Sequence, residues 1–501
     1  MKRRDFIKTT GGLIAAAAGT PWAGILAGDA LGNAAGNRFN VLFLTADDMN
    51  ATMPGWMGNP LKPTPNMDAL AGTCHRFVNN RAAAPICQPS REAMMTGRVP
   101  HRSGGYGFNP IRAGIPTLVT VLKAAGYFTA GFNKITHMAP PGSFPWDMQR
   151  DGSGKNPAEV GKDVADGIKS ARDAGKPFFI NCNITDPHRP FYGAAQKGGK
   201  NPENLPHEFA PGAVTVPSFL EDVPGVRKEI SQYYNSVQRL DVSIGKALDA
   251  LKASGQENRT LVLFVSDHGM PFPFAKATLY HNGPWCPVIL RWPGMGSPKA
   301  YDEMTSSTDI MPTLLDLLGV PKPEGMDGRS WATLFNGGQQ PDRDYVVSHV
   351  NSLSSGMPFP QRLVQTKNSA LIFSPWSDGK TRFRCESMSG LTFKALLAAG
   401  KTDSRIRARI DQYLVGYLLA FYDLEKDPDQ RTNALDDPKH RAEIDRLKQI
   451  LLGEMTKTED PLLGCFKTVL AGGKADIRSV EKWMLQEEKS LRHGTTSGEN
   501  S

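Results

Sequence analysis

Short apolar runs alternate with longer amphipathic segments along the first part of the chain. Runs rich in β-branched and aromatic residues predict buried strands at residues 40–45, 128–132, 178–183, 260–266 and 287–292. Between them, apolar residues spaced three and four apart predict helices at residues 117–125, 158–174 and 228–253. This alternation predicts an α/β fold in which a large mixed central sheet is sandwiched by helices.

A smaller unit is predicted toward the C-terminus. A helix at residues 309–318 is expected to complete the main core, and the Pro- and Gly-rich passage after it places a boundary near Gln340. Strand-like runs at 345–350, 362–366 and 370–373 precede a helical segment at about 438–456. The expected organisation is a main domain at residues 37–340, a C-terminal subdomain of antiparallel sheet plus helix at 341–473, and a polar tail at 474–501.

The first 36 residues are predicted to be an export signal that takes no part in the fold. A basic start, MKRRDFIK, precedes an apolar run rich in Ala and Gly and then small residues near Ala30. Arg3 and Arg4, followed by Phe6, resemble the twin-arginine signal of bacteria, which implies the Tat export machinery as a partner and a periplasmic or secreted location. A membrane anchor is the alternative, but Pro21 interrupts the run, which is short for a bilayer span.

Composition and charge narrow the classes of function. The chain has 501 residues, of which 40% are hydrophobic and 22% charged, and this excludes a disordered chain, a coiled coil or a collagen. Its six cysteines include no CxxC pair, so neither a disulfide scaffold nor a structural zinc site is expected. The net charge of +8 favours anionic ligands, but no stripe of Lys and Arg with interleaved aromatics is present, so nucleic acid is not an expected partner.

Acidic residues directly follow two of the predicted strands. Asp47 and Asp48 come after the first strand, and Asp267 and His268 come after the strand at 260–266. Each pair alone could be a helix cap or a turn. However, adjacent carboxylates at a strand end repel each other unless a cation lies between them, and in such a sheet both strand ends can converge on one hard divalent ion. Ca²⁺ is the expected ion, with Mg²⁺ as the alternative.

Cys87 lies in the most distinctive local motif, ICQPSR, which is followed by TGR at residues 96–98. A buried free cysteine beside a helix start is the alternative interpretation, because Pro and Ser are common there. The C-x-P-S-R and T-G-R elements resemble the signature of the sulfatase family. The resemblance implies that Cys87 is oxidised to formylglycine by a separate maturation enzyme.

Further charged groups follow the other predicted strands. Lys134 and His137 come after the strand that ends at residue 132, His188 lies in DPHRPF after the strand at 178–183, and Lys276 lies in PFPFAKATLY. A lone Lys or His at such a place would more often be a surface charge or a hydrogen-bonded core residue. Their order along the chain nevertheless resembles that of the sulfatases, and a YDLEKDP run at residues 422–428 extends the resemblance over nearly all of the chain after residue 40.

The resemblance implies a role for each candidate residue. The implied ligands of the divalent metal are Asp47, Asp48, Asp267, His268 and Cys87. The implied catalytic groups are Cys87 as the formylglycine nucleophile, Arg91 as the group that holds the hydrated aldehyde, Lys134 and Lys276 as sulfate ligands, His137 as the base that releases sulfate, and His188, with Lys276, as the acid for the leaving group.

The substrate class follows from the same resemblance, which implies hydrolysis of a sulfate ester or N-sulfate on a sulfated carbohydrate. The spacing of Lys134 and His137 is similar to that of iduronate-2-sulfatases, whereas GMPFPFAKATLY is similar to heparan N-sulfoglucosamine sulfohydrolases, which carry Arg in place of Lys276. Two alternatives stay open. One is a phosphodiesterase or phosphonate hydrolase of the same superfamily, and the other is a non-catalytic sulfated-glycan-binding protein in which Cys87 is not converted.

Overall fold

The computed structural model describes residues 38–194 and 205–496, with side chains described as far as residue 491. The predicted export signal at residues 1–36 lies outside the described residues. Among the helices that are described, none is both long enough and apolar enough to cross a membrane.

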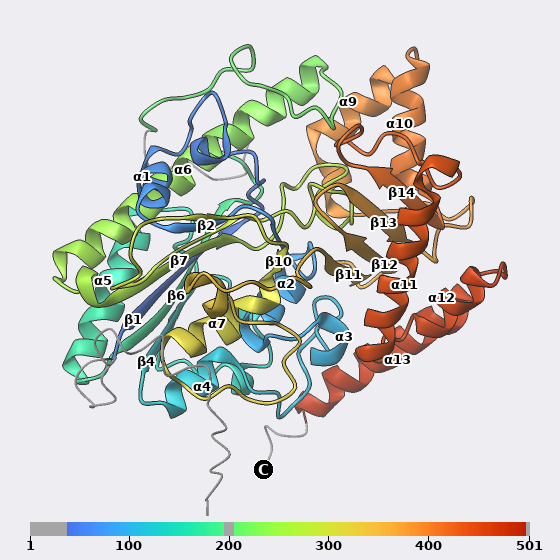
Figure 1. Cartoon of the computed structure of the whole chain (residues 1–501). Coiled ribbons are helices and arrows are strands. Elements are labelled where there is room, and N and C mark those ends of the chain that lie inside the picture. The colour runs from blue at the N-terminus through green and yellow to red at the C-terminus, as the bar shows by residue number, and fades with distance from the viewer. Residues whose placement is uncertain (1–37, 195–204, 497–501) are drawn as a thin grey trace, which may run out of the picture. The chain divides into compact units, whose positions relative to one another are not determined.

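An eight-stranded mixed sheet lies at the centre of the main part of the chain (Figure 1). Its strand order is β5–β4–β6–β1–β7–β8–β2–β9. The strands from β5 to β7 in that order are parallel to one another, whereas β8 is antiparallel to both of its neighbours, β7 and β2. The predicted fold class is confirmed, and all five predicted strands are present. The strands are β1 (Asn40–Asp47), β2 (His75–Phe77), β4 (Phe128–Phe132), β5 (Met148–Arg150), β6 (Phe178–Pro187), β7 (Thr260–Ser266), β8 (Val288–Arg291) and β9 (Ala300–Tyr301).

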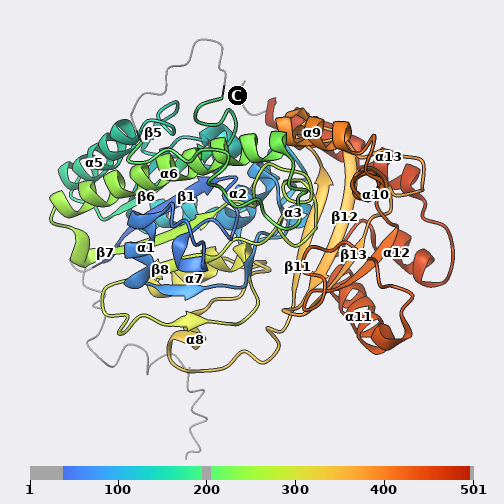
Figure 2. The same ribbon diagram turned by 90° about the horizontal axis from the view of Figure 1, so that it is seen from above.

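Helices cover both faces of this sheet (Figure 2). Side chains of β1 point alternately to the two sides: Leu42 and Leu44 join one hydrophobic cluster, and Val41 and Phe43 join the other. The first cluster is completed by α1 (Pro65–Gly72), α5 (Pro157–Asp173) and α6 (Pro224–Ala253). The second cluster is completed by α2 (Cys87–Thr96), α4 (Leu118–Ala124) and α7 (Ile310–Leu317). The helices expected from the apolar spacing are therefore present.

A four-stranded antiparallel sheet follows in the C-terminal part of the chain, in the order β11–β12–β13–β14. Its predicted helix, α11 (Arg441–Lys457), packs against β12 and β13. The strands are β11 (Val346–Ser352), β12 (Pro358–Gln365), β13 (Ser369–Phe373) and β14 (Leu419–Asp423). The boundary near residue 340 stays a prediction. The other elements are β3 (Asn80–Arg81), β10 (Thr305–Ser306), α3 (Pro100–Ser103), α8 (Ala332–Phe335), α9 (Leu391–Ala399), α10 (Ser404–Val415) and α12 (Leu463–Leu470).

The last part of the chain differs from the expected polar tail. Residues 474–501 contain a helix, α13 (Ile477–Thr496). Its Val480 and Met484 are buried in a third hydrophobic cluster, which includes residues of β13 and α11. Glu487 on this helix forms an ion pair with Arg112 of the main part. Although the segment is rich in charged residues, its apolar residues are spaced three and four apart and lie on one side of the helix. This apolar side packs against the core.

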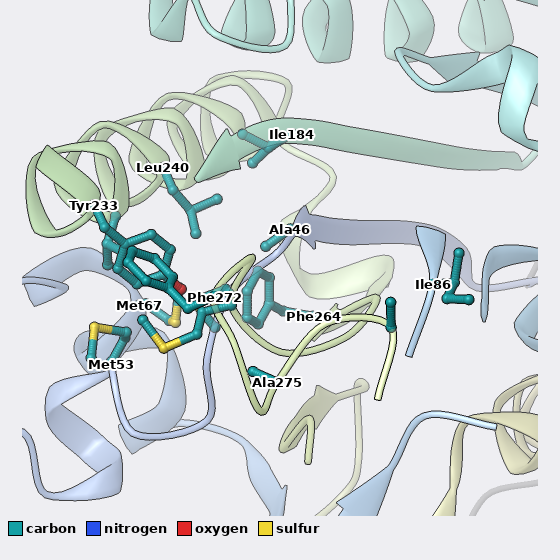
Figure 3. Close-up of a cluster of buried hydrophobic side chains, with 14 of the residues drawn as sticks. Ala46, Met53, Met67, Ile86, Ile184, Tyr233, Leu240, Phe264, Phe272 and Ala275 are labelled. Atoms are coloured by element: carbon teal, nitrogen blue, oxygen red, sulfur yellow. The ribbon is translucent and has the colours of Figure 1, made fainter. Parts of the chain in front are cut away.

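The hydrophobic core extends directly beneath the ends of the central strands (Figure 3). Ala46 near the end of β1 and Phe264 on β7 lie in the same cluster as Tyr233 of α6. The buried Tyr233 hydroxyl donates a hydrogen bond to the Asp48 carbonyl (2.8 Å) and accepts one from the Asn50 N–H (2.9 Å). The core helix α6 thereby fixes the path of the backbone just after β1.

Candidate functional site

The carboxyl ends of three parallel strands meet at one edge of the sheet. Strand β1 ends at Asp47 between β6 and β7, and its Ala46 is paired with Ser266, the last residue of β7. The Asp48 N–H donates a hydrogen bond to Oδ1 of Asp267 (3.1 Å), so the two predicted acidic pairs are in direct contact. The sequence prediction that both strand ends converge on one place is confirmed by this geometry.

Left-handed backbone conformations occur just after two of the central strands. Asp48 has a φ of 73° after β1, and Asn133 and Lys134 have φ values of 58° and 52° after β4. L side chains rarely adopt this region, and such residues cluster at active sites, where the surrounding structure holds them. Here the conformation turns the chain abruptly, so that consecutive side chains after a strand can face one pocket.

Cys87 is the first residue of α2 and is buried, with 1% of its surface exposed. Its Sγ lies 3.4 Å from Oδ1 of Asp47 and 3.2 Å from Nε2 of His268. Burial, reinforced by the negative charge of Asp47, raises the pKa of the Cys87 thiol well above its ordinary value. The unmodified side chain therefore stays a neutral thiol, which is a poor nucleophile.

Four of the predicted metal ligands form a compact cluster. Asp47, Asp48, Cys87 and His268 each bring one ligand-type atom within 4.8 Å of the others. Oδ2 of Asp47 and Oδ1 of Asp48 are buried, and each faces a lysine ammonium group, that of Lys134 and that of Lys276 respectively. The Nδ1 atom of His268 lies 3.0 Å from the Gly269 carbonyl, to which it can donate, so Nε2 keeps a lone pair directed at Cys87. This set of oxygen and nitrogen donors fits a divalent cation.

Arg91 lies behind this cluster and joins the three strand ends. Its NH1 donates hydrogen bonds to Oγ1 of Thr45 on β1 (2.9 Å) and to Oδ1 of Asn183 on β6 (2.5 Å). Its NH2 donates to Oδ2 of Asp267 after β7 (2.9 Å). Asp267 uses its other oxygen to accept the backbone N–H groups of Asp48 and His268. This carboxylate therefore lies beside the four-residue cluster with both of its oxygens engaged by the protein.

Two lysines bring positive charge into the pocket. Nζ of Lys134 lies 2.5 Å from Oδ2 of Asp47, and Nζ of Lys276 lies 2.9 Å from Oδ1 of Asp48. Burial opposes the charged form of each lysine, but the adjacent carboxylates outweigh it and raise both lysine pKa values. Burial likewise opposes ionisation of Asp47, but the charge of Lys134 and other cations holds its pKa well below the ordinary value. Burial and the charge of Asp47 raise the pKa of Asp267, because the carboxylates share one pocket.

The two predicted histidines lie at the same pocket. His188 has Nδ1 2.5 Å from the Arg189 carbonyl, to which it can donate, and Nε2 3.9 Å from Oδ2 of Asp48. His137 lies in the short 3₁₀ helix Ile135–His137, where its ring packs edge-on against Phe108. Burial, followed by the positive charge of Lys134, lowers the pKa of His137 to about 3. His137 is therefore neutral near pH 7 and able to accept a proton.

Sequence reasoning missed two groups at the site. Asn183 accepts the hydrogen bond from Arg91 and donates to the Asn133 carbonyl (3.0 Å), and its only signal is that it is a polar residue within an apolar strand. Glu386, from the short 3₁₀ helix Glu386–Ser389, has Oε1 2.5 Å from Nζ of Lys276. No periodicity or motif marks Glu386, because it reaches the pocket from a loop far along the chain.

Comparison with known proteins places these features in a family. The Sulfatase family model matches residues 39–320. Human N-sulphoglucosamine sulphohydrolase is 28% identical over 477 residues, which cover 84% of this chain and 91% of the human enzyme. An arylsulfatase of Clostridium perfringens is 23% identical over 84% of this chain and 95% of that protein.

Solved structures share the fold. A 2-O GAG sulfatase superposes with a TM-score of 0.64 at 19% identity, covering 85% of this chain and 93% of that one. A phosphonate monoester hydrolase of Agrobacterium radiobacter superposes with a TM-score of 0.65 at 17% identity, covering 84% and 96%. Together with the sequence relatives, the fold and the site define a hydrolase of sulfuric esters. The chain belongs to the sulfatase family.

Replacing Arg91 with methionine should strongly destabilise the protein, because Asp267 would lose its cationic partner while remaining buried. Removal of one partner from such a pair costs about 3–5 kcal/mol of unfolding free energy. Urea denaturation followed by circular dichroism measures the loss, and Arg405→Met, at an exposed arginine on α10, is the matched control. Equal stability of the Arg91→Met variant and the native protein would contradict the role of Arg91 as the link between the strands.

Proposed function

We propose that this sulfatase removes sulfate from a sulfated carbohydrate, using a formylglycine made from Cys87 and a bound divalent metal ion. The observation that carries the proposal is the position of Cys87 at the buried start of α2, against Asp47 and His268. The carbohydrate substrate is supported by the relatives: human N-sulphoglucosamine sulphohydrolase, and an ulvan-active sulfatase of Formosa agariphila that is 27% identical over 66% of this chain and 65% of that protein. A structural neighbour was solved in complex with D-glucosamine-2-N,6-O-disulfate and superposes with a TM-score of 0.63.

The surroundings of Cys87 suit an oxidised side chain better than a thiolate. A hydrated formylglycine supplies one hydroxyl that attacks sulfur and a second hydroxyl whose deprotonation expels sulfate. Arg91 lies one helical turn after Cys87, and its Nε is buried with no hydrogen-bond partner in the described part of the chain. That donor is available to hold an oxygen at position 87, as the family resemblance implies.

The metal would be held by Asp47, Asp48, His268 and residue 87, with Asp267 beside them. The ion, Ca²⁺ or Mg²⁺, would offset negative charge on the sulfuryl oxygens and orient the nucleophile. Nε2 of His268 faces this cluster, 3.2 Å from Sγ of Cys87 and 3.7 Å from Oδ1 of Asp267. Asp267 would contribute chiefly by fixing the backbone of Asp48 and His268, through the two N–H groups that it accepts.

The charges at the site favour an anionic substrate once a cation is bound. The four carboxylates of Asp47, Asp48, Asp267 and Glu386 exceed the three cations Arg91, Lys134 and Lys276 by one charge. A divalent ion would therefore leave the pocket positive, and the two lysine ammonium groups would bind sulfate oxygens.

Proton transfer is assigned to the two histidines. His137 would accept the proton whose loss releases sulfate, because burial and the charge of Lys134 keep its ring unprotonated near pH 7. Nε2 of His188 faces the pocket near Asp48 and would donate a proton to the departing oxygen or nitrogen, together with Lys276. The position of Nε2 of His188 and Nζ of Lys276 beside Asp48 supports their part in this proposal.

The cellular setting completes the proposal. The twin-arginine pattern in the first 36 residues supports export by the Tat machinery to the periplasm or the medium. A formylglycine-generating enzyme would have to act on Cys87 before the chain folds, because the thiol is buried in the folded protein. Tat export carries proteins that are already folded, so maturation would precede export.

Oxidation of Cys87 is tested directly by mass spectrometry of the peptide that contains it, from protein made in the native host. We expect the mass of the aldehyde or its hydrate, because the site holds a neutral group at this position. Cys87→Ala should lose sulfatase activity by about a thousandfold or more. Cys465→Ala, at a buried cysteine on α12, serves as the control. An unmodified thiol in all of an active preparation would overturn the proposal, and an unmodified thiol in an inactive protein would favour a non-catalytic glycan-binding role.

Removal of the metal should abolish turnover reversibly. Dialysis against a chelator is expected to reduce the rate to background, and Ca²⁺ should restore it, because the Asp47 and Asp48 carboxylates lose their shared cation. Elemental analysis before and after dialysis measures the bound metal. Asp48→Asn should weaken metal retention, whereas Asp411→Asn, at a half-exposed position on α10, should not. Full activity of metal-free protein would contradict the metal site.

The substrate class is tested with a panel of defined sugars: N-sulfoglucosamine, glucosamine 3-sulfate and glucosamine 6-sulfate, each beside the matching phosphate compound. Turnover of at least one monosulfated sugar is expected, with kcat/KM for the matching phosphate lower by about a hundredfold, since a dianionic phosphate requires more positive charge than this site supplies. A preference for phosphate would favour the phosphodiesterase or phosphonate hydrolase alternative.

A further inference from the structure

Glu386 is an acidic side chain of the C-terminal part that reaches the active site. Its Oε1 lies 2.5 Å from Nζ of Lys276, which in turn lies 2.9 Å from Oδ1 of Asp48. Glu386, Asp48 and His188 also bring ligand-type atoms within 4.8 Å of one another. The Glu386 side chain is 33% exposed, whereas those of Lys276 and Asp48 are 2% and 0% exposed. Glu386 is therefore the most exposed of these three side chains.

The segment that carries Glu386 is held firmly against the catalytic core. Glu229 on α6 accepts hydrogen bonds from the N–H groups of Leu391 (2.9 Å) and Thr392 (2.7 Å), at the start of α9. Helix α9 packs against α6, as both views show (Figures 1 and 2). These contacts fix the chain a few residues after Glu386.

Arg189 adds a second anchor to this segment. It is paired with Glu229 and donates a hydrogen bond to the Pro271 carbonyl (3.0 Å). Gly390 lies so close that a Cβ there would be 2.5 Å from NH2 of Arg189 and 2.7 Å from Oε1 of Glu229. Because Arg189 directly follows His188, the segment and one of the proposed catalytic histidines share one support. Glu386 is thus held in place before substrate binds.

The position and charge of Glu386 point to substrate selection. We propose that Glu386 is a specificity-determining residue, whose carboxylate accepts a hydrogen bond from a hydroxyl or ammonium group next to the scissile sulfate and disfavours a second sulfate there. The inference rests on the proposed function and adds to it the chemical class of substrate: a sugar that carries a free donor group beside the sulfate. A carboxylate accepts such donors strongly, whereas a like charge at the same place is repelled.

The pairing with Lys276 argues against a different use of Glu386 as a metal ligand. Its carboxylate is already neutralised by an ammonium group, and that ammonium separates it from Asp48. A sugar hydroxyl can donate to this carboxylate without disturbing its pair with Lys276, because a carboxylate offers about four lone-pair sites.

Glu386→Gln tests the proposal because it keeps the shape of the side chain and removes its charge. We would measure kcat/KM for release of the N-sulfate from N-sulfoglucosamine and from the same sugar with a second sulfate on the adjacent carbon, N-sulfoglucosamine 3-sulfate. If the native enzyme prefers another monosulfated sugar of the panel, that sugar is compared with its counterpart that carries a second sulfate on the nearest free hydroxyl or amino group. The native protein should prefer the monosulfate, and Glu386→Gln should reduce that preference at least tenfold, chiefly through KM.

Glu425→Gln, at an exposed glutamate of the same subdomain, is the matched control and should keep the native preference. Glu386→Asp, which restores the charge, should recover part of the preference, and circular dichroism checks that each variant is folded. An unchanged preference in a folded, active Glu386→Gln variant would overturn the proposal. Failure of the proposed function looks different, because the native protein itself would then turn over no sulfated sugar.

Discussion

The structure depends on the balance of buried charges at the ends of three parallel strands. Asp47, Asp48 and Asp267 are fully buried, and each is accompanied by a cation or by backbone N–H groups. A buried ion that loses its partner is costly, so this arrangement holds only if every member is in place. Arg91 is central to it, because one guanidinium contacts Thr45 on β1, Asn183 on β6 and Asp267 just after β7. The proposed catalytic groups therefore take their positions from the same contacts that join the strands.

The core and the site support each other through the first residues after each strand. Tyr233 of α6 holds the backbone after β1, and Asp267 holds the backbone of Asp48 and His268. The left-handed conformation of Asp48 turns its carboxylate toward Lys276, although L residues rarely adopt that conformation. A pocket built in this way is rigid, which suits a reaction that requires several charged groups to meet one small anion.

Much of the fold and of the inner site could be predicted from the sequence, because the relevant signals are local. Apolar runs of strand length predict Asp47 and Asp267 at strand ends. Because β1 and β7 are neighbouring parallel strands, these two ends lie side by side. Other features depend on contacts between distant parts of the chain. Glu386 reaches Lys276 from across the fold, and α13 buries Val480 in spite of a charged composition. Glu386 has no periodic or motif signal, and the apolar residues of α13, although spaced three and four apart, are few among many charged ones.

The site also contains residues from both the main part and the C-terminal part of the chain. The segment around Glu386 belongs to the C-terminal part, yet it is bound to α6 and to Arg189 of the main part. Variation in the segment around Glu386 among sulfatases would change the side chains next to the sulfate but not the proposed catalytic residues. Chemistry and selection would then be carried by different parts of the chain, as is common when loops surround a conserved type of scaffold.

The most direct measurement is a crystal structure of the fully processed protein grown with Ca²⁺, with the ion located by anomalous scattering. The account predicts one Ca²⁺ with carboxylate oxygens of Asp47 and Asp48 at about 2.3–2.6 Å, and an oxygen-bearing side chain at residue 87 directed at the ion. A sulfur at residue 87 turned away from these carboxylates, with both of them still paired to Lys134 and Lys276 and no ion between them, would contradict it.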